Sequence, residues 1–103
     1  MEQDYKHKLM GMVITKIRKK KNIKAKHIAL AIKQTPASVS KMESGLLRIS
    51  AVVLNDIAVA LGVTVTEMYE VYSKLLEKYE EVIIKVELDY LALAVVHNSL
   101  DVI

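Results

Sequence analysis

The side chains of this sequence that could do chemistry are mainly lysines and arginines, and they lie unevenly along the chain. Residues 1–50 hold twelve Lys or Arg and three acids, whereas residues 51–103 hold three Lys and nine acids. The two halves therefore carry net charges of +9 and −6. Basic side chains bind nucleic acid by releasing counterions from its phosphates. This charge division indicates either a polyanion partner for the first half or a basic face that is merely solvated.

Other reactive residue types show no arrangement that suits catalysis. His7, His27 and His97 lie far apart without the spacing of metal ligands, and no cysteine is present. The three glycines form no phosphate-binding loop, and Ser38 and Ser40 have no evident base nearby. We therefore expect no metal, no cofactor and no enzymatic activity.

Length and composition indicate a single small domain. The chain has 103 residues, of which 52% are hydrophobic and only five, all tyrosines, are aromatic. A core must therefore be aliphatic. No apolar stretch reaches the roughly 18 residues of a membrane span, and the first ten residues lack the apolar block of a secretion signal. With no cysteine to form disulfides, we expect a cytoplasmic protein that does not bind membranes.

Hydrophobic spacing predicts three helices in the basic half. Apolar residues recur at helical intervals over residues 5–20 and again over residues 25–32. A third helix is expected to begin with Thr35 as N-cap and Pro36 at its first position, and to end before Gly45.

Two more helices are predicted after residue 50. Ser50 is placed to cap a fourth helix, and Gly62 is placed to end it. Thr64 and Glu67 have the spacing of a capping box, which predicts the start of a fifth helix.

The pattern after residue 70 allows two interpretations. Residues 72–86 carry apolar side chains at helical spacing, while every second residue from Val82 to Tyr90 is apolar and alternates with Lys85, Glu87 and Asp89, as in a strand. We favour a helix to about residue 81, a strand over 82–88 and a short helix after Asp89.

Taken in order, these elements resemble the Cro/lambda-repressor (Xre) family of helix-turn-helix DNA-binding domains. The matching motifs are "IA" at 28–29, "TPASVS" at 35–40, "KMESG" at 41–45 and "IAVALGV" at 57–63, together with Arg18. The resemblance covers residues 17–68 and implies a mainly α, five-helix lambda-repressor-like fold. In that family an Arg of the first helix pairs with a Glu near the end of the recognition helix, which here implies an ion pair between Arg18 and Glu43.

The resemblance also implies which residues touch double-stranded DNA. The expected base-reading residues are Thr35, Pro36, Ala37, Ser38 and Lys41. The expected phosphate contacts are Lys24, Lys26, Lys33 and Arg48. The third helix offers no Arg, Asn or Gln for a bidentate base contact, so we expect modest sequence selectivity. Lys33 replaces the Gly usual in the turn between the second and third helices.

The segment after this domain is unusually apolar. We predict a DNA-binding domain over residues 1–71 and an oligomerisation extension over residues 72–103. The residues expected at a homodimer interface are Leu88, Leu91, Leu93, Val95 and Val96. The alternative is a sixth element packed on its own domain.

The leading functional hypothesis is a dimeric transcriptional regulator, with repression as its expected effect. A second hypothesis is a protein-interaction module, similar to an antitoxin, that uses residues 72–103 for a protein partner and reads little or no DNA. RNA binding ranks last because the basic half has few aromatic side chains on which bases could stack.

Overall fold

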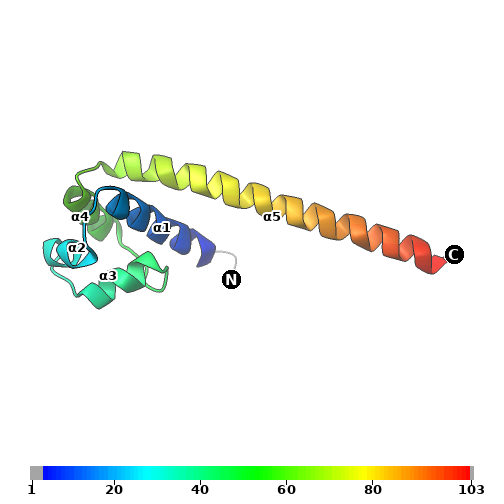
Figure 1. Cartoon of the computed structure of the whole chain (residues 1–103), viewed down its shortest axis with the longest axis horizontal. Helices are drawn as coiled ribbons and strands as arrows, with labels where there is room; N and C mark the ends of the chain where they lie inside the picture. Colours follow the sequence, from blue (N-terminus) through cyan, green and yellow to red (C-terminus); the bar gives the residue numbers. More distant parts are fainter. Residues whose placement is uncertain (1–3, 103) are drawn as a thin grey trace.

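A computed structural model describes the backbone of residues 4–102 and the side chains of residues 5–94. This part of the chain forms five helices: α1 (Asp4–Lys20), α2 (Ala25–Ala31), α3 (Pro36–Glu43), α4 (Ala51–Leu61) and α5 (Val65–Val102). Figure 1 shows α1 to α4 gathered around the start of α5, while the rest of α5 runs away from them as a single helix. The mainly α fold with five helices is confirmed.

The predicted capping residues form the hydrogen bonds expected of them. Thr35 Oγ1 accepts from the Ser38 amide at 3.1 Å, and Ser50 Oγ accepts from the Val53 amide at 3.2 Å. Glu67 donates its amide to Thr64 Oγ1 at 3.0 Å, which forms half of the capping box. These bonds satisfy amide groups that have no partner inside the helix, so they define where α3, α4 and α5 begin.

An aliphatic core joins all five helices. Its buried side chains are Val13 and Ile14 of α1, Ile28 and Ala29 of α2, Val39 and Met42 of α3, Leu54, Ile57, Ala58 and Leu61 of α4, and Met68 of α5. No aromatic residue is among them. Met68 is the buried contribution of α5 to this core, and Val71, Tyr72 and Leu75 of its next turns pack against the core while staying partly exposed.

The predicted strand over residues 82–88 is wrong, since α5 is one continuous helix from Val65 to Val102. The segment is apolar on two opposite faces of this helix, so its pattern also satisfied the alternation of a strand. A strand needs a neighbouring strand for its backbone hydrogen bonds, and the described residues offer only helices. Extending an existing helix adds one hydrogen bond for each residue ordered, which favours continuation.

The long α5 gives the chain an elongated shape. The chain measures 66 × 24 × 23 Å, and its radius of gyration of 18.7 Å exceeds the ~13 Å of a compact domain of this length. The boundary predicted after residue 71 falls inside α5. Contacts with α1 continue beyond it, because Tyr5 stacks on Tyr79 with ring centroids 4.7 Å apart.

Among the described residues, no single helix is long and apolar enough to cross a membrane. Helix α4 and residues 65–94, which are bent by 101° relative to each other, together have the length and composition of a span.

Candidate nucleic-acid interface

The helix α3 lies against α2, and the apolar contact between them determines which face of α3 points outward. Val39 and Met42 are only 1% and 4% exposed and pack in the same core as Ile28 and Ala29 of α2. Since Val39 and Met42 are three residues apart, they occupy one side of α3. The opposite side of the helix is left at the surface.

The turn between α2 and α3 contains a residue in an unusual backbone conformation. Lys33 has φ = +57°, in the left-handed region that favours glycine. The Gln34 amide donates to the Ala29 carbonyl oxygen at 2.9 Å, which closes the turn. Lys33 thus keeps the turn geometry for which the family usually has glycine, at a cost of about 1 kcal/mol.

Most residues expected to read bases lie on the exposed side of α3. Thr35, Pro36, Ala37 and Lys41 are exposed, while Ser38 is half-buried. The hydroxyl oxygen of Thr35 caps α3, so its free proton is the part left to donate to another molecule.

Ser40 belongs to the same outward face, although the sequence analysis did not select it. It is exposed and lies three residues after Ala37, on the side of α3 opposite Val39 and Met42. The spacing of those two buried residues was the signal that could have identified Ser40.

The four cations expected at phosphates are all exposed and come from the start of α2 and from the connections on either side of α3. Lys24 is the N-cap residue of α2, where its side chain makes no capping hydrogen bond. Lys26 lies in the first turn of α2, Lys33 in the α2–α3 turn and Arg48 in the loop between α3 and α4. They are spread over the elements that flank α3.

Arg18 and Glu43 connect α1 to the end of α3 through a two-pronged ion pair. Arg18 Nε lies 2.7 Å from Glu43 Oε1, and a second guanidinium nitrogen donates to Glu43 Oε2 at 3.1 Å. The side chains are only 14% and 12% exposed. The hydrogen bonds to Glu43 raise the pKa of Arg18 above its ordinary value, against the opposing effect of burial. Arg18 also donates to the Ile23 carbonyl oxygen at 3.0 Å, which ties the α1–α2 turn to the same point.

Two residues of α1 complete this junction, and the sequence analysis missed both. The Thr15 hydroxyl lies 2.9 Å from Glu43 Oε2 and 3.0 Å from the Gly11 carbonyl oxygen, and its single proton can go to either. A Cβ atom on Gly11 would lie 2.6 Å from the Met42 carbonyl oxygen and closer still to that of Glu43. Helix α1 therefore touches the backbone of α3 at a point where only glycine fits. No local pattern marks either residue, because both contacts join distant parts of the chain.

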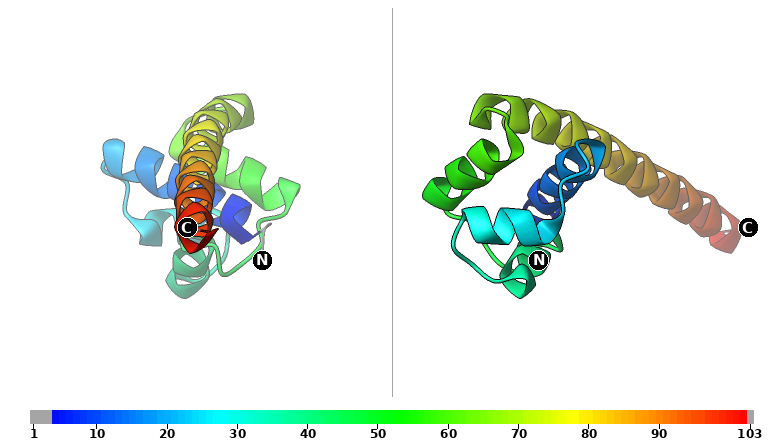
Figure 2. Two further views of the ribbon diagram at one scale, coloured as in Figure 1. Left: turned by 90° about the vertical axis from the view of Figure 1, so that its right-hand side faces the viewer. Right: turned by 60° about the vertical axis from the view of Figure 1, so that its left-hand side comes forward.

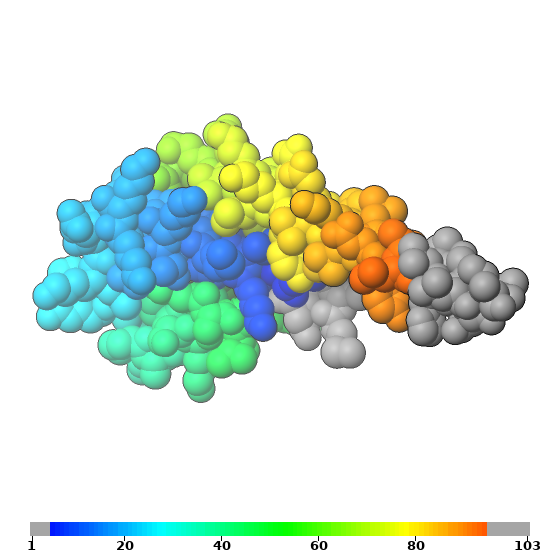
Figure 3. Space-filling view, turned by 45° about the vertical axis from the view of Figure 1, so that its right-hand side comes forward, coloured from blue at the N-terminus to red at the C-terminus, as the bar shows by residue number. Residues whose placement is uncertain are grey.

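The outward face of α3 is not covered by α5. Helix α5 packs against α1 and α4, and the views in Figures 1 and 2 place α3 on the opposite side of the bundle from the first turns of α5. In the space-filling view of Figure 3, α3 forms part of the outer surface of the domain, away from the projecting helix. A double helix could therefore approach α3 without meeting the tail of the same chain.

The residues expected at a dimer interface lie on the projecting part of α5. Leu88, Leu91 and Leu93 are 60%, 57% and 69% exposed. Leu93 lies about 160° around the helix from Leu91, so the three do not share one face. Val95 and Val96 fall outside the residues whose side chains the structure describes.

Comparisons with known proteins agree with this architecture. A helix-turn-helix family model matches residues 14–68. No curated protein matches the sequence. Two crystal structures described as the clp gene regulator ClgR from Corynebacterium glutamicum are similar to the chain, each at 22% identity. They have TM-scores of 0.65 and 0.69, and the matches cover 67% and 79% of this chain and 90% and 88% of ClgR. At this identity the likeness concerns the fold alone.

Proposed function

The chain belongs to the Xre/Cro-type helix-turn-helix family of DNA-binding transcriptional regulators, and we propose that it is a dimeric repressor with modest sequence selectivity. The observation that carries this proposal is the open outer face of α3, held against α1 by the pair of Arg18 and Glu43. A recognition helix enters the major groove while the preceding helix crosses the phosphate backbone. The compartment in which such a protein would act is the one that holds the DNA, the cytoplasm of a bacterial cell.

The side chains on α3 support weak rather than strong base reading. Lys41 can donate to guanine, Ser38 and Thr35 can hydrogen-bond to several bases, and the carbon atoms of Pro36 or Ala37 can touch a thymine methyl group. None provides the bidentate contact that contributes about 1–3 kcal/mol of discrimination. Selectivity would therefore rest on close apolar approach and on single hydrogen bonds.

Affinity would come mainly from the exposed cations around α3. Lys24 and Lys26 extend from the start of α2, Lys33 from the α2–α3 turn and Arg48 from the α3–α4 loop, and we expect them to meet phosphates beside the groove that α3 occupies. Each phosphate neutralised adds about 0.9 to the slope of log affinity against log salt. Binding should therefore weaken steeply as salt is added.

Dimerisation through α5 is supported by an apolar stripe that continues along this helix beyond the part that packs on the core. Leu75 packs on the core and Tyr79 stacks on Tyr5. The same stripe then continues to Val82, Val86 and Leu93, which are 59–69% exposed. Spacings of three, four and seven residues are those of a coiled-coil seam. A second copy of α5 is the partner we propose for this stripe, because it would bring two α3 helices to one DNA molecule.

The DNA-binding part of the proposal is tested by fluorescence anisotropy with random and selected duplexes over a range of salt. We expect Arg48→Ala to weaken binding to all duplexes and to lower the salt slope by about one. Lys41→Ala should weaken the selected duplex more than the random one. Lys74→Ala, an exposed lysine on α5, serves as the charge-matched control and should change neither quantity. Absence of binding to every duplex at low salt would refute the proposal.

The dimer is tested by sedimentation of the full chain and of a version ending at residue 81, which keeps the contacts of Tyr5 with Tyr79 and Glu80. We expect a dimer for the full chain and a folded monomer for the shorter one. Val86→Glu in the full chain should also give a monomer, because it places a charge in the seam. A monomeric full chain at the concentrations that bind DNA would contradict dimerisation.

A protein-interaction module remains the second candidate, and one observation favours it. Ile84, Leu88 and Leu91 form a further apolar stripe on α5, with 55–60% exposure, nearly opposite the stripe of Val82 and Val86. Pairing of two helices through one stripe leaves the other exposed. A module of this kind would keep its assembly in the double variant Lys41→Ala/Arg48→Ala. Its wild-type chain would bind no duplex.

A further inference from the structure

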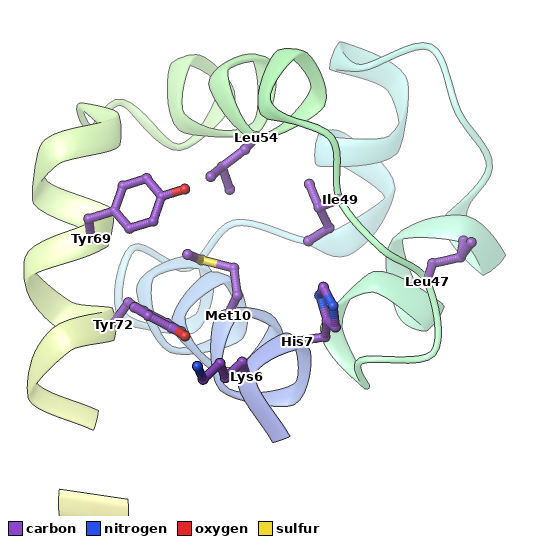
Figure 4. Close-up of a pocket in the computed structure, with 8 residues that line it drawn as sticks. All are labelled: Lys6, His7, Met10, Leu47, Ile49, Leu54, Tyr69 and Tyr72. Atoms are coloured by element: carbon purple, nitrogen blue, oxygen red, sulfur yellow. The ribbon is translucent and has the colours of Figure 1, made fainter. Parts of the chain in front are cut away.

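A pocket of about 210 Å³ opens between the N-terminal half of α1, the α3–α4 loop, the start of α4 and the start of α5. Figure 4 shows the side chains that line it: Lys6, His7, Met10, Leu47, Ile49, Leu54, Tyr69 and Tyr72. Nothing in the DNA-binding arrangement requires a hollow here, since the outer face of α3 lies elsewhere on the domain. The pocket therefore calls for a separate explanation.

The lining has an apolar part and a polar part. Leu54 is buried, and Met10 and Ile49 are partly buried against the core, so together they form an aliphatic wall. In Figure 4 the Lys6 ammonium and the Tyr72 hydroxyl both lie on the side of the pocket away from Leu54 and Ile49, and the ammonium lies 6.0 Å from the centre of the Tyr5 ring. This separation suits a ligand with one apolar end and one anionic end.

The polar groups of the lining are free to receive such a ligand. Among the described residues, Lys6, His7, Tyr69 and Tyr72 make no side-chain hydrogen bonds with protein groups. Burial raises the pKa of the Tyr72 hydroxyl, so it stays protonated at neutral pH and can donate a hydrogen bond. Lys6 adds a cation at the edge of the pocket.

We propose that this pocket binds a small aromatic monocarboxylate, with its ring between Met10, Ile49 and Leu54 and its carboxylate beside Lys6 and Tyr72. The volume lies below the ~300 Å³ at which pockets for larger ligands begin, so the ligand has a single ring and a short acidic arm. Rings pack well against aliphatic and aromatic side chains, and a carboxylate gains most from donors at the edge of an apolar site.

A ligand in this pocket would lie close to a residue expected to contact DNA, and its effect on DNA binding is an inference that rests on the proposed function. Leu47 and Ile49 form one wall, and Arg48 lies between them in the same loop. A ligand against this wall would restrict the loop and so alter how Arg48 meets a phosphate. The acid would thus act as an effector of the regulator.

The binding site itself is tested by titrating the isotope-labelled full chain with benzoate and with phenylacetate, following amide NMR signals. We expect saturable shifts centred on the lining residues, with a dissociation constant in the millimolar range or below. Benzamide lacks the charge and acetate lacks the ring, so both should bind more weakly. Equal shifts with benzamide or with acetate, or no saturable shift with either acid, would overturn the proposal.

Two variants and one control locate the effect. Lys6→Gln should weaken benzoate binding by up to about fivefold, as expected for loss of one exposed charge contact. Leu47→Trp should fill the pocket from a residue that is already 38% exposed, and should abolish the shifts. Lys20→Gln, near the far end of α1, should change nothing. An unchanged affinity in Lys6→Gln would refute the assigned role of the charge, even if Leu47→Trp failed to fold.

The regulatory step has its own measurement, the affinity for a selected duplex with and without saturating benzoate. We expect at least a twofold change in wild type and none in Leu47→Trp. An unchanged DNA affinity despite bound benzoate would overturn the effector role. The NMR titration measures ligand binding without DNA. A protein that bound the acid but no duplex would therefore refute the proposed function and still support the proposed ligand site.

Discussion

Substitution of Gly11 by alanine sets two physical effects against each other. Gly11 lies in the interior of α1, where glycine is about 1 kcal/mol less favourable than alanine, so helix propensity predicts stabilisation. The tertiary structure predicts the opposite. The new Cβ would lie 2.6 Å from the Met42 carbonyl oxygen and 2.6 Å from the Glu43 carbonyl carbon, while ordinary contact begins at 3.4 Å. These two contacts alone would require the helices to separate by about 0.8 Å, and the Glu43 carbonyl oxygen, which is closer still, would require more.

The size of the effect follows from what must move. The contacted atoms belong to the α3 backbone rather than to a flexible side chain, so the strain is not relieved by a rotamer change. Overpacking of this kind costs about 3 kcal/mol. After the gain in propensity, we expect a net loss of about 2 kcal/mol and a decrease in Tm of roughly 10 °C for a domain of this size.

The measurement is urea and thermal unfolding followed by circular dichroism, at one protein concentration because oligomers stabilise by mass action. Lys16→Ala, an exposed position of α1, is the control and should stay within about 0.5 kcal/mol of wild type. A Gly11→Ala protein as stable as wild type, or more stable, would show that α1 and α3 are not in the close contact described above.

Three further substitutions test other parts of the domain. Glu43→Gln should lower stability by about 2–3 kcal/mol in urea unfolding, because it leaves the largely buried Arg18 guanidinium without its carboxylate; exposed Glu70→Gln should not. Lys33→Gly should raise stability by about 0.5–1 kcal/mol by relieving the left-handed backbone, and should lower the salt slope of DNA binding by about one, which anisotropy measures. Thr35→Ala should cost about 1 kcal/mol through loss of the α3 cap, whereas a thermal scan unchanged from wild type would contradict the capping role.

The helix starts could be predicted from the sequence because their causes are local. The Thr35, Ser50 and Thr64 hydroxyls each accept from an amide three residues ahead, so a window of four residues contains the whole interaction. The spacing of Val39 and Met42 likewise identified the inner side of α3.

The strand prediction failed because it, too, was based on a local pattern. Residues 82–88 are apolar on two faces of a helix, and a local pattern of this sort fits both a helix and a strand. The choice depends on whether a second strand exists to pair with, which is a property of the whole chain. Where the described residues offer only helices, the backbone satisfies its hydrogen bonds within α5.

Sequence alone determined the helix boundaries up to residue 65, the aliphatic nature of the core, the charge division and the family resemblance, since each of these depends on residue types or on neighbours within one or two turns. Tertiary structure decided the junction of Gly11 and Thr15 with the end of α3, the extent of α5 and the pocket beside Lys6. The junction and the pocket arise where segments 25 or more residues apart meet, and no local pattern specifies the distance between two packed helices. The extent of α5 depends on whether a strand is present to pair with, and the described residues offer only helices.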